Sequence, residues 1–152
     1  MTQKGTIFTQ SNHKLEGEGL NLMDLNLLKD FNKKLIRLKL KITKLRKQGI
    51  LTIGAITKDF FNDLKFKAPK DWNVPFKIFC YQTTGKTFGQ LQSDLPFVNE
   101  GSSLEILVQT NRLIIKFRKN SASFQLPTAQ DYYFFFNLSG NTEIQLIPIK
   151  DT

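Results

Sequence analysis

The chain has 152 residues and a formal net charge of +9, with 22 Lys and Arg against 13 Asp and Glu. Apolar residues make up 40% and aromatic residues 12%, which is enough to build a core and excludes a wholly disordered chain. No apolar run reaches the roughly 18 to 20 residues of a membrane-spanning helix, and residues 1–20 lack the apolar stretch of a signal peptide.

Residues 1–19 are polar, and after Met1 their apolar anchors are Ile7, Phe8 and Leu15. They show neither a helical nor a strand period. We therefore expect an extended anchoring arm that becomes ordered only against a partner. A frayed chain terminus is an equal alternative.

Residues 20–49 favour a helix, because leucine and lysine dominate, Gly and Pro are absent before Gly49, and Gly49 stands where a helix would stop. Apolar residues recur every three or four positions and fill sites a and d of three heptads: Leu28, Phe31, Leu35, Leu38, Ile42 and Leu45. The spacing predicts a helix from about Asp24 to Gln48, on the order of 38 Å long, with this seam forming a coiled-coil stalk. Two alternatives stay open. The residues from Leu38 to Thr43 alternate as a strand does, and an amphipathic helix could lie on the chain's own β-domain.

The same segment holds most of the charge. Between Lys29 and Lys47 nine cations face one carboxylate, Asp30, so this stretch carries +8 of the +9. A basic helix of this kind indicates a nucleic-acid partner. Its apolar spacing is as regular as its charge, and it lacks the Asn or paired Arg of a base-reading helix, so nucleic acid is the less favoured partner.

Residues 50–152 are typical of an all-β head, because short apolar segments recur between turn residues. The clearest pattern is a hairpin of 104–109 and 113–118, whose turn contains Asn111, a residue that tolerates positive φ. Consecutive aromatics at Phe134, Phe135 and Phe136 place rings on both faces of one strand, so the face away from the core must meet a second sheet, a partner or a ligand. The expected strands are 51–56, 64–67, 76–82, 104–109, 113–118, 123–126, 132–138 and 143–148.

Catalytic constellations are scarce. A Ser–His–Asp or Cys–His arrangement would need His13, the single histidine, and Cys80 lies among apolar residues where a small buried thiol is expected. The single cysteine also excludes an internal disulfide. Nothing in the spacing of carboxylates, His or Cys indicates a metal site or a cofactor. We therefore expect a protein that is not an enzyme and that uses no cofactor or metal.

Binding residues are sought among aromatics near loops and at hairpin tips, because flat rings with a polar edge stack on sugars and anchor interfaces. The expected binding surface of the head consists of Trp72, Phe88, Gln90, Asn111 and Arg112.

Two resemblances extend these expectations. A polar arm, a heptad stalk followed by the segment Leu51–Ile56, and a β-head of about 100 residues resemble the small fibre and baseplate proteins of tailed phages. That resemblance implies a homotrimer in the virion, anchored to a capsid or tail protein by its arm and displaying the head to the host surface, where a glycan is a candidate ligand. The segments from Leu95 to Leu146 are similar in order and spacing to the second half of galectin sandwiches, with Phe88-Gly89 at the Trp-Gly position but without the His-x-Asn-x-Arg strand.

The sequence thus predicts a mainly β chain with one long N-terminal helix: an antiparallel β-sandwich head, jelly-roll or galectin-like, preceded by a coiled-coil stalk. The leading function is that of a trimeric fibre-like spike for host attachment. A monomeric galectin-like carbohydrate-binding module is the first alternative, and a nucleic-acid-binding protein that uses the basic helix is the second.

Overall fold

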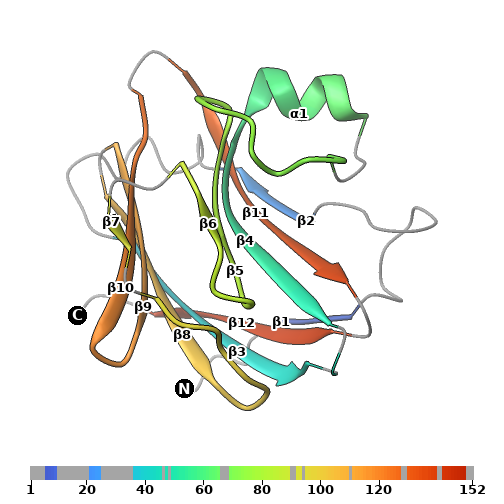
Figure 1. The fold of residues 1–152 in the computed structure, drawn as a ribbon, viewed down its shortest axis with the longest axis vertical. Helices are drawn as coiled ribbons and strands as arrows, with labels where there is room; N and C mark the ends of the chain where they lie inside the picture. The colour runs from blue at the N-terminus through green and yellow to red at the C-terminus, as the bar shows by residue number, and fades with distance from the viewer. Residues whose placement is uncertain are drawn as a thin grey trace.

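The fold is seen in a computed structural model of the chain (Figure 1). The structure describes residues 6–9, 21–24, 36–45, 47, 49–65, 69–89, 92–93, 95–109, 111–127, 130–139 and 142–149. The elements formed by these residues are β1 Thr6–Thr9, β2 Asn21–Asp24, β3 Ile36–Lys44, β4 Ile50–Thr57, α1 Lys58–Leu64, β5 Ile78–Gln82, β6 Thr87–Phe88, β7 Gln92–Ser93, β8 Ser103–Gln109, β9 Arg112–Phe117, β10 Asn120–Gln125, β11 Tyr132–Ser139 and β12 Glu143–Ile149.

The strands form two antiparallel sheets. One has seven strands in the order β1-β12-β3-β8-β9-β10-β7, and the other has five in the order β2-β11-β4-β5-β6. Figure 1 shows the sheets as two layers, with the short helix α1 beside the five-stranded sheet on the side away from the seven-stranded one. The expected antiparallel β-sandwich architecture is confirmed to this extent: the residues that the structure describes are mainly β and form two sheets and one short helix.

The main core lies between the two sheets and follows the period-two alternation of strands. Along β3, Leu38, Leu40 and Ile42 are buried while the cations between them are exposed. The inward residues of β4, β5 and β8 to β11 join the same core, and Phe124, Phe134 and Leu40 are among the side chains with no exposure. Burial of such side chains is worth about 1.5 to 3 kcal/mol each, so this layer supplies most of the stabilisation.

The predicted helix from Asp24 to Gln48 is wrong. Residues 36–44 form β3, an inner strand hydrogen-bonded to β12 and β8. Of the expected coiled-coil seam, Leu38 and Ile42 are buried in the main core and Leu45 packs against it. The remaining seam residues lie outside the described part of the chain, namely Leu28, Phe31 and Leu35. Leu38 and Ile42 fit both the three-to-four-residue spacing of a helix and the two-residue spacing of a strand. Hydrogen bonding of β3 to a strand on each side overrides the helix propensity of Leu and Lys.

The expected arm is also corrected where the structure describes it. Ile7 and Phe8 lie in β1, which pairs with β12 at the edge of the seven-stranded sheet. β2 pairs with β11 at the edge of the five-stranded sheet. Leu15 lies outside the described residues. Short strands from the N-terminal segment therefore complete both sheets.

The predicted hairpin is confirmed as β8 and β9. Glu105 pairs with Lys116 and Gln109 with Arg112, so the connection is a two-residue turn. Asn111 in that turn has φ of 62°, the left-handed conformation that asparagine tolerates better than most residues.

A second apolar layer covers the outer face of the five-stranded sheet. Phe134 and Phe136 point into the main core, whereas Phe135 lies on the other face and belongs to this outer cluster. The cluster consists of Ile56, Phe61, Ile78, Cys80 and Phe135, with Phe60, Leu64, Trp72, Val74, Phe88 and Tyr133 packed against it. The chain's own helix and the loop after it therefore supply the second partner that the aromatic run requires.

The helix of this layer begins at the N-cap Thr57, whose Oγ1 accepts a hydrogen bond from Phe60 N at 3.3 Å. It ends at Lys65, which has φ of 53°. The strand predicted over 64–67 is therefore wrong at its start, since Leu64 closes α1; residues 66–68 lie outside the described part of the chain. Among the described residues, no helix has the length and apolar character needed to span a membrane.

Candidate binding surface

The structure brings together two of the five residues expected to bind. Trp72 and Phe88 both pack on the outer cluster, and the Trp72 ring stacks on Phe135 with centroids 5.6 Å apart and planes 2° from parallel. Trp72 is half-buried. One face of the ring is thus covered by the chain's own phenylalanine, and Trp72 contributes to the packing of the helix and loop layer.

The other expected residues lie elsewhere. Asn111 and Arg112 are exposed at the tip of the β8–β9 hairpin, in the opposite sheet, and Asn111 O accepts a hydrogen bond from Leu126 N at 2.8 Å. Gln90 lies outside the described residues. The four predicted positions that the structure describes therefore do not form one surface.

A polar row crosses the outer face of the five-stranded sheet beyond the outer cluster. Asn137, Thr52 and Gln82 stand in register on β11, β4 and β5, and Gln82 Nε2 donates a hydrogen bond to Thr52 Oγ1 at 3.2 Å. All three side chains are buried. Because they are buried, these side chains offer no surface to a ligand.

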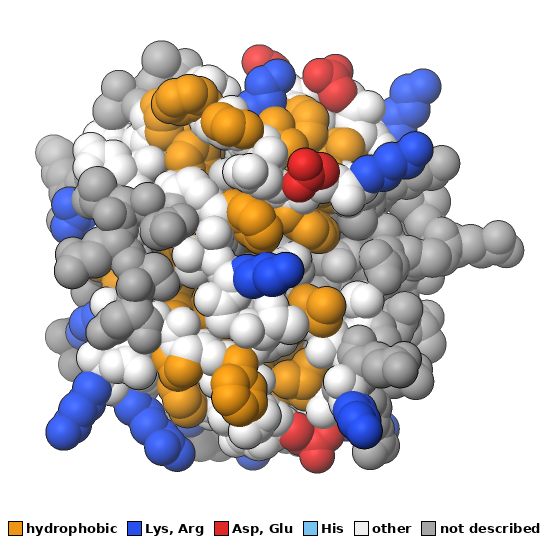
Figure 2. Space-filling view, in the orientation of Figure 1, with side chains coloured by type: hydrophobic (Ala, Val, Ile, Leu, Met, Phe, Trp, Pro, Cys, Tyr) orange, Lys and Arg blue, Asp and Glu red, His pale blue; other side chains and the backbone are white. Residues whose placement is uncertain are grey.

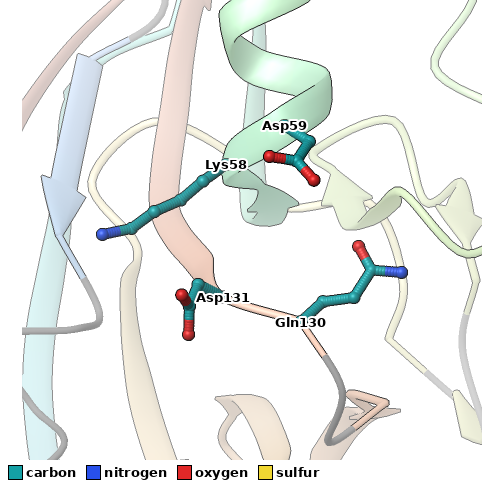
Figure 3. A pocket seen from close by; sticks show the side chains of 4 residues that line it. All are labelled: Lys58, Asp59, Gln130 and Asp131. Atoms are coloured by element: carbon teal, nitrogen blue, oxygen red, sulfur yellow. The ribbon is translucent and has the colours of Figure 1, made fainter.

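A small polar pocket of 160 Å³ lies where α1 meets the segment before β11. Figure 3 shows Asp59 and Gln130 directed toward one another, while the Lys58 side chain extends away from them. The Lys58 ammonium lies 4.8 Å from the centroid of the Tyr133 ring. Within the described part of the chain, no group of three or more His, Cys, Asp or Glu could hold a metal ion.

A concentration of exposed cations lies on the outer face of the seven-stranded sheet. Because Leu38, Leu40 and Ile42 point inward, the alternate residues of β3 point outward. They are joined by cations of β9 and the turn after it. We call this surface the basic face; its exposed cations are Arg37, Lys39, Lys41, Lys116 and Arg118.

One carboxylate lies among these cations. Glu105 on β8 pairs in register with Lys39 of β3 on one side and with Lys116 of β9 on the other. Its Oε1 lies 3.7 Å from Arg37 Nε, and both side chains are exposed to about 40%. The five named cations and Glu105 together carry a net charge of +4.

A shallow depression of about 390 Å³ opens at the centre of the basic face. Its lining consists of Lys39, Ser103, Leu104, Glu105, Lys116 and Arg118. The Arg118 guanidinium lies 5.0 Å from the ring centroid of Phe117, which is half-buried against the main core. Figure 2 shows hydrophobic side chains gathered on the viewed side and basic side chains projecting mainly at its margin, including two at the lower left, beside the seven-stranded sheet of Figure 1.

The sequence contained the signal for this surface. Residues 37–42 alternate strictly between cationic and apolar side chains, the pattern of a half-buried strand. The heptad interpretation of the same residues placed the cations around a helix, where they would not have formed a flat array.

Comparisons with known proteins give little beyond this geometry. No family model matches the chain, and no curated protein matches it. Among solved structures, an alginate lyase of polysaccharide lyase family 7, AlgAT5, aligns with a TM-score of 0.37 and 9% identity, over 91% of this chain and 65% of that chain. The chain thus spans slightly less than two thirds of that enzyme.

One expectation is corrected by this comparison. The scarcity of catalytic motifs led us to expect a protein that is not an enzyme, but one solved structure with which the chain aligns is itself an enzyme. The exclusion of enzymes is therefore withdrawn. A likeness this weak assigns no activity to the chain.

Proposed function

We propose that the protein is a binding module that holds an anionic polymer on its basic face. The observation that carries this proposal is the array of five exposed cations, three of which line one shallow depression, namely Lys39, Lys116 and Arg118. Alternate residues along a strand are about 6.7 Å apart and neighbouring strands about 4.8 Å apart. The cations therefore form a grid on the order of 13 Å by 10 Å, which suits several acidic groups of one chain better than one small anion.

The expected strength follows from exposure. A single exposed ion pair contributes about 0.2 to 1 kcal/mol, so useful affinity requires several contacts at once. Charges at such a surface are screened over about 8 to 10 Å at physiological salt. Binding should therefore be moderate and should weaken steeply as salt is added.

This proposal replaces the trimeric spike as the leading function. The spike rested on a helical stalk and on aromatic surface that one sandwich could not bury. Within residues 20–49 the structure describes the strands β2 and β3 rather than a helical stalk. The outward aromatic residues of β11, Tyr133 and Phe135, belong to the outer cluster, which α1 and Trp72 complete. The nucleic-acid alternative rested on a basic helix, whereas Arg37, Lys39 and Lys41 lie on the strand β3.

The test compares two double variants in a binding titration. Lys39→Gln with Lys116→Gln removes two cations from the rim of the depression. Lys70→Gln with Lys86→Gln removes two exposed cations outside the basic face and is the matched control. The probes are fluorescent polygalacturonate and inorganic polyphosphate, with dextran as the uncharged polymer.

We expect the intact protein to bind at least one of the anionic probes, and dextran to remain unbound. The variant of the basic face should lose about tenfold in affinity for a bound probe, and the control should stay within about twofold. Equal loss in both double variants, or no binding of either anionic probe, would refute the proposal.

A further inference from the structure

We propose that Glu105 makes the basic face selective for acidic polysaccharides, chains that carry hydroxyl groups beside their acidic groups, over phosphate polymers. The inference rests on the proposed function, because it assigns a substrate class to the same surface. It starts from an oddity of that surface: a site that attracts anions has a carboxylate at its centre.

The position of Glu105 is well defined. Its strand neighbours in register are Lys39 and Lys116, and all three side chains line the depression. Arg37 lies 3.7 Å from Glu105 Oε1 and holds the carboxylate on the face. The side chain stays about 42% exposed, so its remaining acceptor positions are open to a ligand.

The chemistry of a carboxylate decides what it prefers. An ionised carboxylate accepts hydrogen bonds and donates none. A phosphate chain brings only further acceptors and negative charge to Glu105, so the two repel each other. A polysaccharide brings hydroxyl donors, and hydrogen bonds from such donors to an ion are stronger than those between neutral groups.

The cations around Glu105 complete the match. Lys39 and Lys116 stand one strand away on either side, within reach of acidic groups on the same ligand chain whose hydroxyls contact Glu105. Ser103 adds a hydroxyl to the lining that both donates and accepts. The depression thus places cations that can bind acidic groups beside Glu105 and Ser103, which can bind hydroxyl groups. An acidic polysaccharide carries both kinds of group.

The surroundings also disfavour single-stranded nucleic acid. Proteins that bind such strands stack successive bases on exposed aromatic side chains. Among the described residues that line the depression there is no aromatic side chain. The nearby Phe117 is half-buried against the main core with Arg118 over its ring, so it offers no open stacking face.

The experiment measures the affinity of the full chain for polygalacturonate and for inorganic polyphosphate, before and after Glu105→Gln. The variant keeps the size of the side chain and removes its charge. Asp63→Asn, an exposed carboxylate of α1, is the matched control for the change in net charge. Thermal unfolding of all three proteins verifies that the fold is kept.

We expect the intact protein to prefer polygalacturonate. Glu105→Gln should weaken polygalacturonate binding about fivefold and strengthen polyphosphate binding about twofold, whereas Asp63→Asn should change neither by more than a small factor. Strengthened binding of both polymers would show that Glu105 only lowers the local potential, and a preference of the intact protein for polyphosphate would contradict the selectivity. Either result overturns this inference while the proposed function stands. Binding of neither polymer overturns the proposed function, and the inference with it.

Discussion

Replacement of Gly54 by alanine gives the sharpest test of the fold. Gly54 lies within β4, in register with Cys80 of β5 and Phe135 of β11. A Cβ at this position would lie 2.0 Å from Phe79 O and 2.6 Å from the Cys80 Cα. Ordinary contacts begin near 3.4 Å, so the β5 backbone would have to move by about 1.4 Å.

The cost can be estimated from that displacement. Overpacking of a tight interior costs about 1 to 3 kcal/mol, and loss of one or two ladder hydrogen bonds adds about 1 kcal/mol each. We therefore expect Gly54→Ala to lower the free energy of unfolding by about 2 to 5 kcal/mol. Because a domain is stable by only about 5 to 15 kcal/mol, the variant should be visibly destabilised.

Urea unfolding provides the measurement, followed by circular dichroism and by the fluorescence of Trp72, the single tryptophan. Gly101→Ala is the control, because Gly101 has φ of +88° but nothing lies within 4 Å of the place that an added methyl group would take. That change should cost about 1 kcal/mol through backbone strain alone. A loss below 1 kcal/mol for Gly54→Ala, or equal losses in the two variants, would refute the close approach of β4 and β5.

Two further predictions follow from burial. Leu40→Ala should lower the free energy of unfolding by about 2 to 5 kcal/mol, whereas Lys39→Gln should change it by no more than about 0.5 kcal/mol. If urea unfolding shows no loss of stability for Leu40→Ala, the result would favour the helix instead, because that helix leaves Leu40 outside its seam. Burial raises the pKa of the Cys80 thiol above its ordinary 9.0 and that of the Tyr132 hydroxyl to about 12, so the folded chain keeps these protons after the unfolded chain loses them. The free energy of unfolding should therefore fall above pH 9, by about 1.4 kcal/mol per pH unit for each such group. In Cys80→Ala this fall should begin only near about pH 10, where tyrosine ionises. Urea midpoints that stay level to pH 11 would contradict this prediction.

Local patterns were sufficient where a strand and its turn carry their own signals. The β8–β9 hairpin was predicted because apolar residues alternate on both sides of Asn111, and its positive φ agrees with that residue type. The run from Phe134 to Phe136 was correctly expected to serve two faces. What covers the second face could not be predicted, because the contact between Phe135 and Trp72 joins residues far apart in the chain.

The segment of β3 shows why local patterns can fail. Leu38 and Ile42 fit a heptad as well as a strand, so their spacing could not decide between them. Leu40 was the discriminating residue: it falls outside the helical seam, yet it is fully buried between β12 and β8. Pairing partners more than 60 residues later in the chain make that choice, and no local window contains them.

The basic face was missed for the same reason. Once residues 36–44 are a strand, Lys39 falls into register with Glu105 and Lys116. The individual charges were plain in the sequence, but a surface made from β3, β8 and β9 can be recognised only after the register of the strands is known.

The short helix α1 could have been inferred from Thr57 as a cap with Asp59 in the first turn.

The edges of the two sheets have a consequence for how sandwiches of this kind meet one another. The four edge strands are short as described, four residues each in β1 and β2 and two each in β6 and β7. Behind β1 and β2 stand β12 and β11, with seven and eight residues. A chain shortened past Asp24 would turn these long strands into open templates for pairing with other molecules. By covering the edges of β12 and β11, the N-terminal strands reduce edge-to-edge pairing with other molecules. This role differs from the anchoring to a partner that the sequence predicted for the arm.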